Sequence, residues 1–195
     1  LRLRLSEVLD LLGAPAMAAR QSLDEADLHR LRQCLEAARI RWGLDNQQRE
    51  DLGFDMLGDG FTWQKGLNRL MAGYAMAENA ADATSPLLLG EIAPLPDIEG
   101  ETTRVLGILA EFLADLRQWR ETLAHPATPA AWHDRLYPWL ERFFPSNAET
   151  ALELATLRRA LSDLRDHGML GTATGDSQML SSAVVASFLQ TRCEQ

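Results

Sequence analysis

The side chains of this chain that are best suited to chemistry are aromatic and basic residues gathered in two stretches. Together the two stretches contain Arg39, Arg41, Trp42, Trp63, Lys65 and Arg69. Planar aromatic rings can stack on bases and arginines can grip phosphates, and proteins hold single strands of nucleic acid without sequence preference in this way. These six residues are therefore the candidate nucleic-acid contacts.

The same residues also have a purely structural interpretation. On the helix predicted from about 62 to 77, Trp63 and Tyr74 share one face with three further apolar residues, which favours a role as core anchors. Trp42 has the same alternative. Lys65 and Arg69 lie on the opposite, polar face, where cations are commonly only solvated, and for these two the alternatives stay open.

Motifs for enzyme chemistry are missing from the sequence. The glycines at 58 and 60 and the pair Lys65–Gly66 do not form a phosphate-binding loop, which needs a lysine followed by serine or threonine. Asp24, Glu25 and Asp27 fall in the first turn of a predicted helix, where acids complement the helix dipole. The histidines and cysteines lack the spacing of metal ligands. We therefore predict no catalytic site, no metal and no cofactor in this chain.

Size and charge limit the functions that remain. A chain of 195 residues with 46% hydrophobic and 24% charged residues fits one globular domain, or at most two small ones. Its net charge of −9 is unlike that of a free-standing nonspecific DNA binder. A contact with nucleic acid would therefore need a local basic face or a larger assembly. Without an apolar run of roughly 20 residues or a signal peptide, the expected location is the cytoplasm.

The ends of the chain suggest a fragment. It begins at Leu1 without methionine and stops at Gln195 inside a predicted helix. We expect a single helical domain, residues 1–195, excised from a longer chain. The alternative is that an initiator methionine was removed.

Helical periodicity dominates the sequence, and a strand signal is confined to the alternation of Leu1, Leu3 and Leu5 with arginines. Predicted caps are Ser6, Ser22 with Glu25, Asp45 with Gln48, Thr62, Thr128 with Pro129, and Ser146 with Glu149. The predicted helices span about 6–12, 23–39, 45–53, 62–77, 102–123, 128–144 with a kink or break at Pro138, 146–168, and a last segment around 184–189. The expected fold is all-α, an irregular bundle of six to eight helices.

The longest predicted helix carries a strict apolar seam. Its positions alternate four and three apart and are Val105, Leu109, Phe112, Leu116, Trp119 and Leu123. Such a seam needs a partner helix along about 30 Å. A second functional hypothesis is therefore a stand-alone module that binds a partner helix. A monomer that buries the seam internally would count against it.

The segment 79–101 has no helical pattern and contains Pro86, Pro94, Pro96 and Gly90. Structureless connections of this length are uncommon inside compact domains. We predict a linker or a functional loop.

Three motifs resemble a known family. They are Ser6–Leu12 with Pro15, the run Ile40–Asp45, and the stretch Trp63–Met76 with its spaced glycines. They are similar to the middle of the gamma subunit of bacterial exodeoxyribonuclease V, RecC. The similarity is densest from 6 to 77 and weaker from 102 to 195, and the segment 80–100 departs from it.

The resemblance implies an internal helical fragment, similar to the 2B insertion of a superfamily 1 helicase-like subunit whose ATPase motifs have decayed. It implies the beta and alpha subunits of exodeoxyribonuclease V as partners, with ATP and magnesium used by those subunits. The complex degrades and unwinds broken duplex DNA for recombinational repair. On this basis we expect a non-catalytic domain that contributes to DNA channel walls or subunit contacts. Our hypothesis is that Arg39, Arg41, Lys65 and Arg69 face DNA there.

Overall fold

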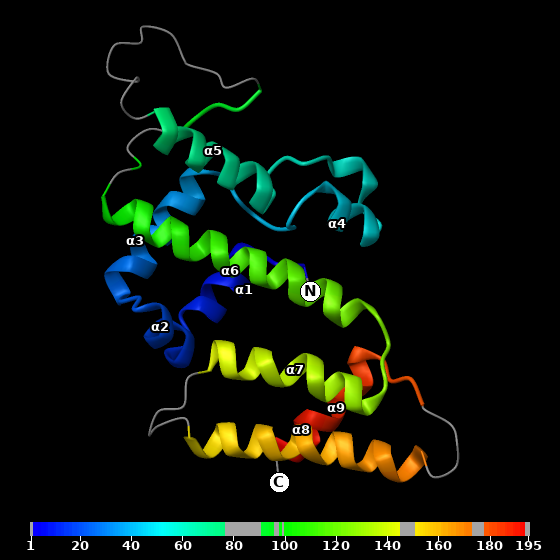
Figure 1. Cartoon of the computed structure of the whole chain (residues 1–195). Helices are drawn as coiled ribbons and strands as arrows, with labels where there is room; N and C mark the ends of the chain where they lie inside the picture. Colours follow the sequence, from blue (N-terminus) through cyan, green and yellow to red (C-terminus); the bar gives the residue numbers. More distant parts are fainter. Residues whose placement is uncertain are drawn as a thin grey trace, which may run out of the picture. The chain divides into compact units, whose positions relative to one another are not determined.

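The computed structural model describes residues 2–76, 91–95, 98, 100–144, 151–172 and 178–193. Within these ranges the chain is helical, and its only β-pairing consists of isolated bridges, so the all-α prediction is confirmed. The nine α-helices of the described residues are α1 Leu5–Leu12, α2 Pro15–Gln21, α3 Glu25–Ala37, α4 Asn46–Asp51, α5 Trp63–Met76, α6 Glu101–Ala124, α7 Pro129–Phe143, α8 Ala151–Thr172 and α9 Ser182–Cys193 (Figure 1). A 3₁₀ turn, η1, covers Asp55–Leu57.

The prediction of six to eight helices missed α2, which begins with Pro15 in the first helical position, where proline is favoured. The chain divides into two compact units, Leu1–Ala114 and Asp115–Gln195. Each unit is described by itself.

The first unit is built from α1 to α5 and the first part of α6. Its core consists of apolar side chains that are almost completely buried. They include Val8 and Leu12 of α1, Leu31 and Leu35 of α3, Trp63 and Leu70 of α5, and Val105, Leu109 and Phe112 of α6. This apolar burial is the main favourable contribution to the unit's stability.

The starts of α1 and α3 differ from the predicted caps. Arg4, not Ser6, occupies the cap position of α1, and the Glu7 carboxylate accepts its backbone N–H at 2.9 Å. Ser22 does not start α3, because it closes α2 in a left-handed conformation with φ 52°. The capping pair of α3 is Asp24 and Asp27, where Asp24 Oδ1 accepts the Asp27 N–H at 2.7 Å.

Asp27 also holds two arginines. It is 5% exposed, accepts a hydrogen bond from Arg30 Nη1 at 3.0 Å, and accepts another from Arg104 Nη2 of α6. The acid at this position therefore fixes α6 against the first turn of α3, in addition to complementing the dipole of α3. The hydrogen bond from Arg104 is the main cause that lowers the pKa of Asp27 below its ordinary value of 3.8, against an opposing effect of burial.

This lowered pKa predicts an acid-dependent loss of stability. The contribution of Asp27 is fully present above its unfolded pKa and is lost as the pH falls below 3.8, through the folded pKa. We expect Asp27→Asn to lower the urea midpoint at pH 7, and we expect this difference from the unsubstituted chain to shrink as the pH is lowered past that range. Exposed Asp10→Asn is the control. A difference that stays constant with pH would contradict the assignment.

The buried face of α5 is not the predicted one. Trp63 and Leu70 are buried as expected, but Met71 and Tyr74 are 53% and 51% exposed. Instead Gly66 and Gly73 face the interior, with the Ile40 side chain against Gly66 and the Leu95 backbone against Gly73. The missing side chains let neighbouring segments approach the helix backbone, so the packed stripe follows the glycines rather than the largest apolar residues.

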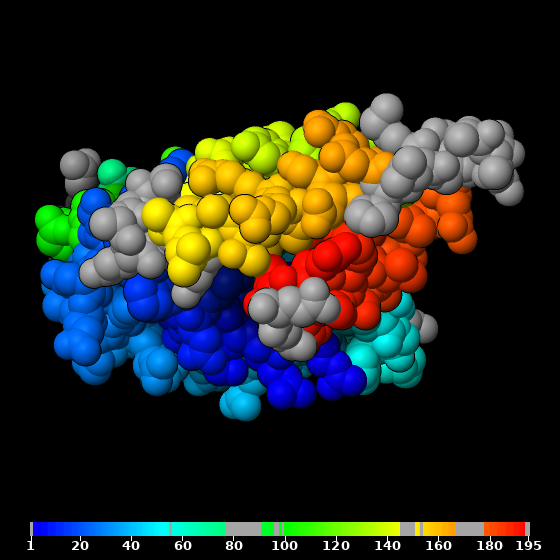
Figure 2. Space-filling view, turned by 90° about the horizontal axis from the view of Figure 1, so that it is seen from below, coloured from blue at the N-terminus to red at the C-terminus, as the bar shows by residue number. Residues whose placement is uncertain are grey.

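The second unit packs α7, α8 and α9 around two apolar clusters. One cluster joins Trp132 of α7, Leu164 of α8 and Val185 of α9. The other joins Leu140 of α7 with Leu154 and Leu161 of α8. In Figure 2, α9 in red lies beside α8 in yellow and orange. The segment after α8 is secured by a bridge between Ala127 and Leu180, and the indole N–H of Trp132 donates to the Leu180 carbonyl at 2.8 Å.

The predicted end of α8 at Gly168 is wrong, because α8 continues to Thr172. α7 shows no break at Pro138, since it is one helix from Pro129 to Phe143. Thr128 and Pro129 begin α7 as predicted, with Thr128 Oγ1 accepting the Ala131 N–H at 3.3 Å. The predicted capping pair Ser146 and Glu149 lies outside the described residues, as do most residues of the predicted 79–101 linker. None of the helices described is both long and apolar enough to cross a membrane.

The α6 seam is used inside the chain. Val105, Leu109, Phe112 and Leu116 are buried in this structure. In the second unit Trp119 stacks on Trp139 at 5.6 Å between ring centroids, and Leu123 packs against the cluster around Trp132. By the criterion stated above, this internal burial counts against a stand-alone module that offers the seam to a partner helix.

Candidate nucleic-acid interface

Three short segments of the first unit run side by side and create a surface groove. The central segment is 39–44. On one side, Leu5 N–H donates to the Arg41 carbonyl at 2.8 Å and Gly43 N–H donates to the Arg2 carbonyl at 3.0 Å. On the other side, Arg41 N–H donates to the Phe61 carbonyl at 2.9 Å. These backbone contacts bring residues from three distant parts of the sequence together.

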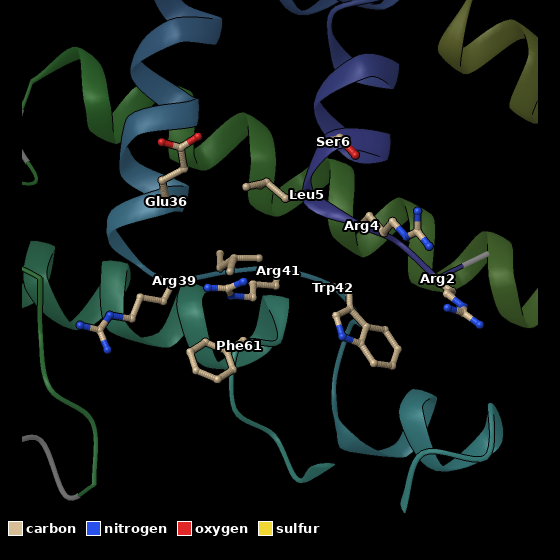
Figure 3. Close-up of a pocket in the computed structure, with 10 residues that line it drawn as sticks. Arg2, Arg4, Leu5, Ser6, Glu36, Arg39, Arg41, Trp42 and Phe61 are labelled. Carbon is tan, nitrogen blue, oxygen red and sulfur yellow. The ribbon is translucent and has the colours of Figure 1, made fainter.

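The groove has a volume of about 930 Å³. Figure 3 shows the side chains that surround it. Its lining consists of Arg2, Arg4, Leu5, Ser6, Glu36, Arg39, Ile40, Arg41, Trp42 and Phe61. The lining contains four arginines and one carboxylate, so the groove is locally basic on a chain whose net charge is −9. This is the local basic face that a nucleic-acid contact requires on an acidic chain.

The groove arginines are only weakly engaged by acids. Arg4 Nε lies 3.9 Å from the Glu7 carboxylate, and its side chain is 59% exposed. The Arg41 guanidinium lies 5.6 Å from the centroid of the Phe61 ring, and that of Arg2 lies 5.4 Å from the Phe54 ring. Within the described part of the chain, Arg2, Arg39 and Arg41 have no carboxylate at ion-pair distance. Their N–H groups are therefore available to an external anion.

Arg39, just after the end of α3, has an unusual backbone conformation. Arg39 N–H donates to the Glu36 carbonyl at 2.9 Å, and Ile40 N–H donates to the Leu35 carbonyl at 3.1 Å, the double hydrogen bond of a Schellman motif. Arg39 itself adopts φ 59°, at the position where glycine is strongly favoured. Holding a side chain in this conformation costs about 1 kcal/mol.

Two other positive-φ residues border the same groove. Leu3, between Arg2 and Arg4, has φ 52°, and Phe61 has φ 64° with its side chain 49% exposed. Backbone strain of this kind persists where surrounding structure enforces it, and it concentrates at functional sites. Three of the four non-glycine residues with positive φ in the described part of the chain lie in or beside this groove.

The structure brings together half of the predicted site residues. Arg39, Arg41 and Trp42 line the groove. Only part of the Trp42 ring is free to stack on a base. The Arg49 guanidinium lies over the ring at 4.6 Å from its centroid, and the Phe54 ring packs edge-on at 5.3 Å between centroids.

The other three predicted residues lie elsewhere. Trp63 is fully buried and donates its indole N–H to the Leu3 carbonyl at 2.8 Å, as expected for a core anchor. Lys65 pairs with Asp59 at 3.3 Å. Arg69 donates to the carbonyls of Ala38 at 3.2 Å and Ala93 at 3.0 Å, where it closes the end of α3.

Among the groove residues that sequence reasoning missed are Arg2, Arg4 and Phe61. The alternation of Arg2 and Arg4 with leucines signalled an extended segment, and its pairing with Trp42 supplies the missing step. Phe61 follows a glycine-rich turn, and nothing in the local sequence marks it as functional. Among the residues described, no group of three or more histidines, cysteines or acids is arranged to hold a metal ion.

The fold and the groove define an all-helical domain with a basic, partly aromatic surface suited to phosphate. Comparison with known proteins makes the assignment specific. The family model for "RecBCD enzyme subunit RecC fourth domain" matches residues 1–195. The chain belongs to this family.

Individual relatives agree with this assignment. The chain is 32% identical over 175 residues to the RecBCD enzyme subunit RecC of Escherichia coli, covering 90% of the chain and 15% of that protein. It is 30% identical over 161 residues to the RecC subunit of Haemophilus influenzae, and 31% identical over 131 residues to that of Mycolicibacterium smegmatis. These alignments cover 83% and 67% of the chain, and 13% and 11% of the relatives. The chain thus spans about one seventh of the Escherichia coli protein.

Proposed function

We propose that this chain is a non-catalytic part of a RecC subunit and that its Arg-rich groove contacts the phosphates of DNA. The observation that carries the proposal is Arg39, an arginine at a Schellman position that favours glycine, on the rim of a groove that three more arginines line. A residue that violates a local preference is expected where function requires its side chain.

The chemistry of the groove suits a phosphate backbone. A guanidinium presents a planar fork of N–H donors that matches phosphate oxygens and stays charged at any physiological pH. The remaining surface carries an excess of acids, which repels DNA from other faces and favours approach at the groove. Phosphate contacts of this type fix position and orientation without reading sequence.

The wider setting belongs to the same proposal. We place the chain in a cytoplasmic assembly that processes double-strand breaks, with the beta and alpha subunits of exodeoxyribonuclease V as partners. Those subunits use ATP and magnesium, and the chain itself contributes to a DNA channel or to subunit contacts, in the manner of a 2B insertion. The support for this setting is the membership of the RecC family and the relatives named as RecBCD enzyme subunits.

Charge reversal in the groove tests the proposal in the full-length subunit within its assembled complex. We expect Arg41→Glu to weaken binding of a DNA end about tenfold and to lower the salt dependence of that binding, because at least one phosphate contact is lost. Arg39→Gly is expected to weaken binding too, while it raises the free energy of unfolding by about 1 kcal/mol through relief of strain.

Arg20→Glu on α2 is the matched control, since it makes the same charge change at an exposed position outside the groove. Lys65→Glu tests the sequence-based hypothesis that Lys65, which lies outside the groove lining, also faces DNA. DNA affinity that falls equally in the Arg41 and Arg20 variants, or in neither, would overturn the groove as the contact.

A further inference from the structure

Two aromatic rings line the groove, and Phe61 is the more exposed of them. Phe61 is 49% exposed, whereas Trp42 is half-buried and partly covered by Arg49 and Phe54. Figure 3 shows the Phe61 ring beside the Arg41 side chain. Phe61 is therefore the aromatic ring that the groove presents most openly to a ligand.

The backbone on both sides of Phe61 is fixed. Its own carbonyl accepts the Arg41 N–H at 2.9 Å. The carbonyl of the preceding residue, Gly60, accepts a hydrogen bond from Arg49 at 2.7 Å, and the following residue, Thr62, is completely buried. The ring thus stands on an ordered backbone, and a ligand that binds it does not have to meet the cost of ordering this segment.

Packing accounts for only part of the conformation of Phe61. Its φ of 64° lies in the left-handed region, which disfavours every residue that has a Cβ and which glycine adopts without cost. Complete burial of the ring would offset this cost, but half of the residue remains exposed. Strained backbone of this kind is expected where the side chain serves a function.

A flat ring among arginines matches the two parts of a nucleotide. Every base has a π-face that can stack on an aromatic side chain. The Arg41 guanidinium lies 5.6 Å from the centroid of the Phe61 ring, so a nucleotide whose base stacks on Phe61 brings its phosphate toward a charged fork of donors. The ring and the guanidinium can therefore bind the same nucleotide.

The state of the DNA decides whether such stacking can occur. In a duplex the faces of the bases are covered by neighbouring base pairs, and the grooves present only base edges. A single strand can turn a base out of its stack and place it on a protein ring. A stacking residue in the groove therefore selects single strands, whereas the arginines alone would also accept the phosphates of a duplex.

We infer that the groove binds single-stranded DNA and that Phe61 stacks on one of its bases. The inference rests on the proposed function, since it takes the groove as the DNA contact. It adds the class of DNA and the residue that selects it. Because stacking tolerates every base, the groove holds the strand without reading its sequence.

Affinity measurements on the full-length subunit in its assembled complex test the stacking. Phe61→Leu keeps an apolar side chain but removes the aromatic ring. We expect it to weaken binding of a single-stranded oligonucleotide about tenfold without changing the salt dependence, because a stacked base is lost and no charge is. Phe61→Trp should retain the affinity. Tyr74→Leu is the matched control, since Tyr74 is 51% exposed and lies outside the groove lining.

A second substrate and a photochemical readout complete the test. Binding of a duplex whose terminal base pairs are covalently crosslinked should be the same for Phe61→Leu and the unsubstituted protein, because this duplex has no free base face. A single strand that carries 5-iododeoxyuridine should photocrosslink to the peptide that contains Phe61, and Phe61→Leu should lose this crosslink. Equal losses of single-strand affinity in the Phe61→Leu and Tyr74→Leu variants, or an unchanged crosslink in Phe61→Leu, would overturn the inference.

The groove arginines separate this inference from the proposed function. If Phe61→Leu binds single strands normally while Arg41→Glu still weakens DNA binding, the stacking is overturned and the phosphate contact stands. If Arg41→Glu leaves DNA binding unchanged, the proposed function of the groove is itself overturned.

Discussion

Replacing Gly73 with alanine is expected to lower the free energy of unfolding by about 3 kcal/mol, at the upper end of the range for overpacked sites. A methyl group built on Gly73 would overlap the carbonyl oxygen and carbon of Leu95. These are backbone atoms, so a change of side-chain rotamer cannot relieve the overlap. The segment is also held in place, because Leu95 N–H donates to the Arg69 carbonyl at 3.1 Å. Urea unfolding of the chain measures the effect.

Two further glycines provide the comparison. Gly107→Ala on the exposed side of α6 meets nothing within 4 Å and is expected to stabilise the chain by about 1 kcal/mol through helix propensity. Gly66→Ala meets Cγ1 and Cδ1 of the buried, β-branched Ile40 side chain, which is stiff at χ1 but is not backbone, so its cost should be intermediate, about 2 kcal/mol. Equal effects at Gly73 and Gly107 would contradict the close backbone approach.

The Gly73 contact also explains the position of Arg69. Residues 91–95 lie across α5, where the Ala93 carbonyl accepts from Arg69 Nε at 3.0 Å. Arg69 therefore joins α5 to this segment and to the end of α3, which accounts for its absence from the groove lining. A displaced 91–95 segment in Gly73→Ala would break this connection as well.

Local signals in the sequence correctly predicted the capping residues of α4, α5 and α7. Thr62 accepts the Lys65 N–H at 3.2 Å and Asp45 accepts the Gln48 N–H at 2.9 Å, as expected for capping residues. Such contacts span three residues, so the information that fixes them is contiguous in the chain. Ser22 shows the limit of this reasoning, because the end of α2 takes the residue that the pattern assigned to the start of α3.

Contacts between residues far apart in the sequence determine the features that local patterns did not predict. The buried carboxylate of Asp27 is matched by Arg104, 77 residues away, and the groove needs segments 2–5, 39–44 and 61–64 to be adjacent. Arg39, Arg41 and Trp42 could be predicted as site residues from the sequence because they are neighbours in the chain. Phe61 and Arg2 join them only through tertiary backbone pairing, which no local pattern encodes.

Arg49→Met is expected to lower the free energy of unfolding by about 3–5 kcal/mol, because it removes three hydrogen bonds that a charged donor makes to backbone carbonyls. Arg49 is 2% exposed, and its guanidinium donates to Trp42 at 2.8 Å, in addition to the two loop carbonyls of Gly58 and Gly60. Methionine keeps much of the volume but removes every donor, so the loss measures hydrogen bonding rather than a cavity. Burial lowers the pKa of Arg49 from its ordinary value, which shows the desolvation that these bonds must offset.

Arg49→Lys distinguishes the geometry from the charge. A lysine retains the positive charge but cannot reach three carbonyls with one planar fork, so we expect it to recover only part of the lost stability. Because Arg49 lies between the groove residue Trp42 and the carbonyls of Gly58 and Gly60, its replacement should disturb the groove as well as the loop before α5. Urea midpoints would give the stability, and the DNA-end affinity of the full-length protein would report the state of the groove. A lysine variant as stable as the unsubstituted chain would mean that charge alone, and not the fork of donors, holds the loop in place.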